Sequence, residues 1–125
     1  MEEDGHSEAL TVAPGFARHL AATGNVIVLA VDYRLAPEHP FPDGLEDCIR
    51  AVKLARKKAL EWGSSPELVS IGGDSAGGNL ALSATLSFLQ ESTSPIRSLL
   101  LFYPVVSAWN DASPSWNTYQ KGAAL

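Results

Sequence analysis

Short apolar runs alternate along this chain with longer stretches in which apolar residues recur at helical spacing. Residues 26–31 are six consecutive apolar residues, and residues 68–71 and 98–103 are two further short runs that are mostly apolar. A run without polar alternation is typical of a strand buried on both faces, as in a parallel sheet. Strands that alternate with helices at these lengths indicate βαβ units. The sequence therefore predicts an α/β fold with a parallel sheet and flanking helices.

Three helices are expected around these runs, over residues 9–22, 43–63 and 76–90. Gly24 and Asn25 provide a stop for the first helix, and Gly63 provides one for the second. Asp43 and Glu46 resemble a capping box at the start of the second helix. That helix has an apolar face made of Leu45, Cys48, Ile49, Val52, Ala55, Ala59 and Leu60. The three prolines of residues 32–42 predict a loop there, because proline removes backbone donors.

Charge and composition narrow the functional classes. The 125 residues carry a formal net charge of −5, which argues against nucleic acid and anionic membranes as partners. No apolar run approaches the ~18 residues that a membrane span needs. The single cysteine, Cys48, allows no intrachain disulfide, and it is expected to be a small core residue that lies on a helix. The N-terminal residues are acidic where a signal peptide would be basic, and together with the lack of a membrane-spanning run they predict a cytoplasmic protein. The oligomeric state stays open.

The residues from Gly73 to Gly77 match the G-x-S-x-G nucleophile elbow between a strand and a helix. Ser75 at the apex is the candidate nucleophile, and Asp74 precedes it within the elbow. We expect Gly73 and Gly77 to crowd each other across the turn, so that both must be very small. The helix that follows starts at the serine, so its free N–H groups favour negative charge there. The N–H of Ala76 is therefore the candidate oxyanion donor.

A phosphate-binding loop is the rival interpretation of the same glycines. Gly72 and Gly77 have the spacing of a Walker A motif, but Gly78 and Asn79 stand where Lys and Ser or Thr are required. The dinucleotide-binding spacing fails as well, because Asp74 occupies the position of its second glycine. The elbow interpretation is therefore preferred over a nucleotide site.

Longer stretches of the chain resemble one enzyme family. Residues 31–42, 73–81 and 101–105 are similar to segments of the hormone-sensitive-lipase-like esterases, the α/β-hydrolase fold-3 group. The resemblance implies hydrolysis of small carboxylic esters with neither a metal nor an organic cofactor. It also implies that Ser75 is the nucleophile, that Ala76 is an oxyanion donor and that Asp74 is not the acid of the catalytic triad.

Two parts of the family pattern are missing from these residues. No His-Gly-Gly-Gly motif precedes the elbow, although that motif supplies further oxyanion donors in the family. The triad order is Ser, then an acid, then His. After Ser75 the acids are Glu91 and Asp111, and no histidine follows. Residues 1–125 are therefore expected to be a single partial α/β-hydrolase domain, weakly active or inactive alone. The alternative is a truncated, non-catalytic binding or interaction protein of the same fold.

Several residues outside the elbow have both a structural and a catalytic interpretation. Asp32 and His39 lie in the proline-rich loop, where side-chain hydrogen bonds to the backbone are the preferred role. Arg34 and Glu38 are expected to form an ion pair that holds this loop. Trp109 and Trp116 either line an acyl pocket or cover an edge of the core, and the second role is preferred.

Overall fold

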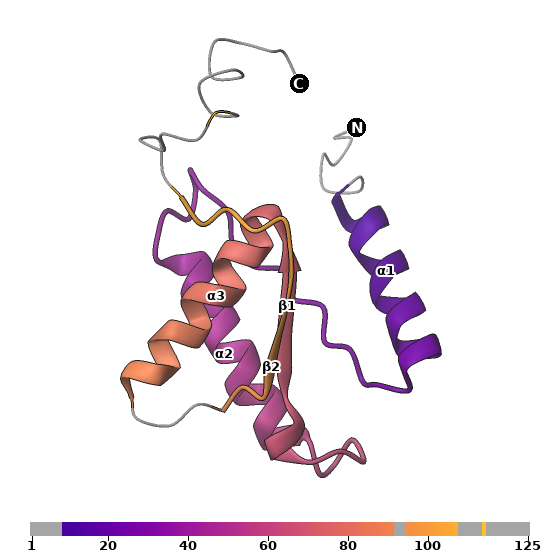
Figure 1. The fold of residues 1–125 in the computed structure, drawn as a ribbon. Helices are drawn as coiled ribbons and strands as arrows, with labels where there is room; N and C mark the ends of the chain where they lie inside the picture. Colours follow the sequence, from indigo (N-terminus) through magenta and orange to yellow (C-terminus); the bar gives the residue numbers. More distant parts are fainter. Residues whose placement is uncertain (1–8, 92–94, 108–113, 115–125) are drawn as a thin grey trace.

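The structure, a computed structural model, describes residues 9–91, 95–107 and 114. In chain order its elements are helix α1 (Ala9–Gly24), helix α2 (Asp43–Lys58), the 3₁₀ turn η1 (Pro66–Leu68), strand β1 (Ser70–Asp74), helix α3 (Ser75–Gln90) and strand β2 (Ser98–Phe102). Figure 1 shows α2 and α3 together on one side of the two strands and α1 on the other. The parallel sheet with flanking helices is thus present.

The two strands form a βαβ unit. β1 pairs with β2 in parallel, with Ser70 opposite Ser98 and Asp74 opposite Phe102. α3 is the crossover between them, as a parallel pair requires. Both strands therefore end at the same edge of the sheet, and the residues that follow Asp74 and Phe102 are brought together there.

The described core lies between α2 and α3. Its buried side chains are small apart from one phenylalanine, and they come from the facing sides of the two helices and from the residue that follows α2: Cys48, Val52, Ala59, Ala81, Ala84, Thr85 and Phe88. Small residues let two helices approach closely over the sheet. Cys48 is buried as expected, and burial raises the pKa of its thiol. Leu60 was expected on the same apolar face but is 77% exposed, because α2 ends at Lys58.

The buried strand predicted over residues 26–31 is not present in the described structure. This segment pairs with neither β1 nor β2, and Figure 1 draws it as a coil between α1 and the rest of the fold. Its side chains are largely exposed, and Ile27 is 54% exposed. A strand buried on both faces needs neighbours for its backbone and layers over both faces. The described residues provide neither for this segment.

The start of α2 differs from the predicted capping box. Pro42 is the N-cap residue, and no side chain caps the helix. The Asp43 carboxylate instead accepts a hydrogen bond from Arg34, and Glu46 pairs with Arg50 one turn further on. The capping-box prediction was therefore wrong, because a cation in the preceding loop occupies the carboxylate that was assigned to the cap.

Arg34 also binds a different partner from the one predicted. Its guanidinium donates from Nε and Nη2 to the two carboxylate oxygens of Asp47, each at 2.9 Å, and its backbone N–H donates to Asp47 Oδ2 at 3.0 Å. No ion pair with Glu38 occurs within the described residues. We call the contacts of Arg34 with Asp43 and Asp47 the loop clamp. It ties the proline-rich loop to the first two turns of α2.

Several element boundaries differ from the expected ones by a few residues. α2 ends at Lys58, and the chain then turns to Gly63, whose φ of 80° lies in the left-handed region that favours glycine. The strand expected from residue 68 begins at Ser70, because η1 precedes it. α3 begins at Ser75, one residue earlier than expected.

Candidate active site

Ser75 lies at the junction of a strand and a helix. β1 ends at Asp74 and α3 begins at Ser75, with no residue between them. Ser75 has a φ of 48°, a left-handed value that is uncommon for a residue with a side chain, and it is exposed. Such a conformation costs on the order of 1–3 kcal/mol and persists where the surroundings enforce it. The turn has the geometry of a nucleophile elbow.

The glycines around Ser75 are not equally constrained. A Cβ on Gly73 would lie 2.5 Å from the carbonyl oxygen of Gly77 and 2.8 Å from the nitrogen of Gly78. A Cβ on Gly78 would lie 2.9 Å from Pro104 Cβ. A Cβ on Gly77 would have Asp74 Oδ1 as its nearest neighbour, at 3.9 Å, which is ordinary contact. The expected crowding between Gly73 and Gly77 is present, but it restricts only position 73, because a side chain on residue 77 has room; the other position beside the turn that lacks space is 78.

The segment that follows β2 is hydrogen-bonded to the first turn of α3. The backbone N–H of Val105 donates to the carbonyl of Ser75 at 3.2 Å. The side-chain amide of Asn79 donates to the carbonyl of Val105 at 2.6 Å. These two bonds, which we call the clasp, place the residues after β2 directly beside Ser75. Our sequence analysis gave Asn79 no role, although its position one helical turn after the serine was a usable signal.

The start of α3 is open to an incoming anion. Ala76 is exposed, and its N–H is one of the first four of the helix, which have no intrahelical acceptor. The Asp74 side chain makes no capping bond to these groups. Burial is the largest cause that raises the pKa of the Tyr33 phenol, and the charges of Cys48 and Asp74 add to it.

No acid–base partner of Ser75 lies in the described part of the chain. Its hydroxyl has no side-chain hydrogen bond there. His39 Nδ1 lies 3.3 Å from Asp43 Oδ2, next to the loop clamp, and Asp32 makes no hydrogen bond within the same residues. His6, Trp109, Asp111 and Trp116 lie outside the described residues. Their expected roles therefore stay predictions.

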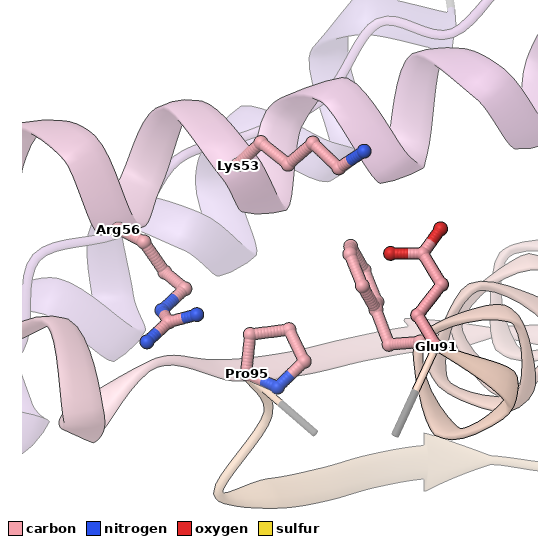
Figure 2. A pocket seen from close by; sticks show the side chains of 5 residues that line it. Lys53, Arg56, Glu91 and Pro95 are labelled. Carbon is pink, nitrogen blue, oxygen red and sulfur yellow. The ribbon is translucent and has the colours of Figure 1, made fainter. Parts of the chain in front are cut away.

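A separate pocket of about 220 Å³ lies away from the elbow. Figure 2 shows it between α2 and the end of α3, lined by Lys53, Arg56, Phe88, Glu91 and Pro95. The Lys53 ammonium lies 5.9 Å from the centre of the Phe88 ring. Because Glu91 follows α3 and Pro95 precedes β2, this pocket is at the amino end of the strands, opposite Ser75. It is not part of the candidate active site.

The described ranges contain neither a cluster of metal ligands nor a membrane-spanning helix. Within them, no three or more His, Cys, Asp or Glu side chains are grouped so that they could hold a metal ion. None of the helices described is both long and apolar enough to cross a bilayer.

Comparison with known proteins places this geometry in a family. Residues 7–125 match the model of a family described as having the alpha/beta hydrolase fold. The chain belongs to this α/β-hydrolase family. The resemblance to hormone-sensitive-lipase-like esterases is thereby confirmed.

Individual α/β hydrolases support the assignment. The chain is 42% identical over 94 residues to the carboxylesterase NlhH of Mycobacterium tuberculosis, covering 74% of this chain and 29% of that protein. It is 36% identical over 100 residues to the hormone-sensitive lipase of Mus musculus, covering 80% of this chain and 13% of the lipase. EstE1, a thermophilic carboxylesterase cloned from a metagenomic library, superposes with a TM-score of 0.78 at 34% identity, over 85% of this chain and 36% of that structure. The chain therefore spans a minor part of these relatives.

Proposed function

We propose that this chain is the nucleophile-bearing part of a serine carboxylic ester hydrolase. The observation that carries the proposal is Ser75 itself: an exposed serine with a φ of 48° that joins the end of β1 directly to the start of α3. This conformation lifts the hydroxyl out of the sheet toward an incoming substrate. The similarity to a carboxylesterase and a lipase supports ester hydrolysis over the alternative of a non-catalytic binding protein.

In the proposed first step, Ser75 Oγ attacks the carbonyl carbon of a small-molecule ester. A general base takes the hydroxyl proton as the new C–O bond forms, and the carbonyl π electrons move to the oxygen. The base later returns the proton to the departing alcohol oxygen. Water then attacks the acyl–serine ester by the same route, releasing the carboxylic acid and restoring the serine.

Ala76 is the proposed donor to the oxyanion of each tetrahedral intermediate. Its N–H has no intrahelical acceptor, and it belongs to the end of α3 that carries the positive part of the helix dipole. Loss of one such donor typically costs on the order of 3 kcal/mol of transition-state stabilisation. Asp74 and Gly73 shape the turn in this proposal, and Gly77 contributes the backbone against which Gly73 packs.

The base and its orienting acid are proposed to lie outside residues 1–125. In this fold the acid and the histidine follow the serine, and no histidine follows Ser75. Residues 1–125 are accordingly proposed to be one partial α/β-hydrolase domain. The proposal includes no metal or organic cofactor and no nucleic-acid partner. It also includes a cytoplasmic location, for which the support is the single cysteine, Cys48.

Covalent labelling tests the role of Ser75. The complete gene product that contains residues 1–125 is treated with a fluorophosphonate probe, and the modified peptide is identified by mass spectrometry. We expect the label on Ser75, and we expect Ser75→Ala to abolish both labelling and ester hydrolysis. Ser64→Ala is the matched control, because Ser64 is exposed and, among the described residues, only its backbone N–H makes a hydrogen bond. Full hydrolysis by Ser75→Ala would overturn the proposal.

A further inference from the structure

The clasp joins the exit of β2 to the candidate nucleophile through two consecutive hydrogen bonds. Val105 donates its N–H to the Ser75 carbonyl at 3.2 Å and accepts at its own carbonyl from Asn79 Nδ2 at 2.6 Å. The backbone N–H and the backbone carbonyl of Val105 are therefore both hydrogen-bonded to the first two turns of α3. This arrangement fixes the direction in which the chain leaves the sheet.

Two backbone features permit this close approach. Pro104 packs directly on Gly78, where a Cβ would lie 2.9 Å from Pro104 Cβ. Tyr103 has a φ of 35°, a left-handed value that turns the chain back over the elbow immediately after β2. An unfavourable conformation in a residue with a side chain persists where other contacts enforce it. The packing of Pro104 on Gly78 supplies such a contact one residue further on, and the clasp at Val105 supplies two more.

The side chains of this exit segment, residues 103–106, are apolar in character and open. Tyr103 is 76% exposed, Val105 49% and Val106 67%. They lie at the carboxyl edge of the sheet, the edge at which α/β folds bind their ligands. An apolar surface fixed beside an exposed serine can receive the hydrocarbon part of an ester.

From these contacts we propose that Asn79 is a positioning residue. Through Val105 it holds the exit segment as an apolar wall beside Ser75, and this wall sets the preference for longer apolar acyl groups. The inference rests on the proposed esterase function and goes beyond it by naming what determines the acyl preference. Asn79 acts through Val105 and does not touch the reacting atoms.

The decisive variant is Asn79→Asp. The carboxylate has nearly the shape of the amide but has no N–H, and it would face the Val105 carbonyl oxygen as a second acceptor. α3 itself tolerates the change, because a negative charge near a helix N-terminus is favourable. Gln90→Glu is the matched control: it makes the same amide-to-carboxylate change at the exposed last residue of α3.

The measurement compares kcat and KM for p-nitrophenyl acetate and p-nitrophenyl hexanoate in the complete gene product. We expect Asn79→Asp to raise KM for the hexanoate about tenfold, the loss of one good hydrogen bond, with little change for the acetate. We expect kcat to change less than KM, and Gln90→Glu to match the wild type. Asn79→Gln, which keeps the amide donor, should recover part of the preference. The NMR signal of the Val105 amide should shift in Asn79→Asp alone.

The results separate this inference from the esterase proposal. If Ser75 is labelled but Asn79→Asp keeps the wild-type ratio of KM values, the inference is overturned and the esterase proposal stands. An equal loss for both esters with a lower Tm would also overturn it, because that result indicates a merely structural role. If Asn79→Asp does not fold, Asn79→Ser takes its place, since a hydroxyl on a shorter side chain cannot span to Val105. Unlabelled Ser75 would instead overturn the underlying function.

Discussion

The guanidinium of Arg34 is bound side-on to the carboxylate of Asp47, with two hydrogen bonds of 2.9 Å between residues thirteen positions apart. A bidentate pair of this kind fixes orientation as well as distance. A third bond, from the Arg34 backbone N–H, makes the same carboxylate a support for the loop itself. The loop that precedes α2 is therefore anchored to that helix.

This anchor should make folding stability depend on acid pH. The hydrogen bonds from Arg34 lower the pKa of Asp47 from 3.8 to about 2. Because the folded pKa is depressed, the stabilisation is fully present above about pH 4 and is lost as pH falls toward 2. We expect Asp47→Asn to flatten the dependence of urea unfolding on pH in that window. Glu61→Gln, at an exposed pair with Lys58, should leave the slope unchanged; an equal flattening there would contradict the assignment.

The two outer glycines of the G-x-S-x-G motif should respond differently to alanine. Gly73→Ala places a methyl group 2.5 Å from the Gly77 carbonyl oxygen, so backbone must move. We expect a loss of about 1–3 kcal/mol in the free energy of unfolding, as for other overpacked sites. Gly77→Ala meets nothing closer than 3.9 Å, and helix propensity favours alanine by up to about 1 kcal/mol. Chemical denaturation of both variants measures the difference, and equal losses would refute this account.

The isolated chain of residues 1–125 should be a poor esterase. Serine is a weak nucleophile until a base removes its proton, and no such base contacts Ser75 in the described structure. We expect turnover of p-nitrophenyl acetate to be lower than in a complete family member by at least about a thousandfold, typical of losing a triad base. Ordinary turnover that disappears in Ser75→Ala would show that the base lies within these residues.

The exposed apolar segment 26–31 should promote self-association of the isolated chain. Ile27 is 54% exposed, and β1 and β2 have a free edge each in the described structure. Unpaired edges and contiguous apolar surface favour contacts between copies. We expect Ile27→Lys to shift sedimentation-velocity profiles toward the monomer. Gln90→Lys adds the same charge at the exposed end of α3 and should have little effect; a wild-type chain that stays monomeric at micromolar concentration would contradict the prediction.

Short sequence patterns predicted the elements that depend mainly on residues close by in the sequence. The periodicity of residues 45–60 predicted α2, although five residues too long, and the glycine-rich turn predicted the elbow and the helix after it, because these signals depend on neighbours a few residues away. The run at 26–31 was assigned to a buried strand from composition alone. Composition shows that a segment can be buried, but burial depends on which other strands are beside it.

Side-chain partners were harder to predict than elements. Arg34 had Glu38 nearby in sequence, yet it binds Asp43 and Asp47, which α2 presents one turn apart on one face. The role of Asn79 likewise depends on Val105, which only the parallel pairing of β1 and β2 brings close. In both cases the sequence contained the chemical groups but not the geometry that selects between them.

The contacts that hold the Ser75 turn in the described structure come from residues close together in the sequence. The strand before it, the helix after it, the glycines that allow the close packing and the clasp from Val105 all fall within residues 70–106. The residues that enforce this conformation thus form one continuous stretch of the sequence. Recombination that exchanged the flanking coding regions would transmit the serine and its immediate supports together, so new substrate-binding regions could be joined to an inherited nucleophile.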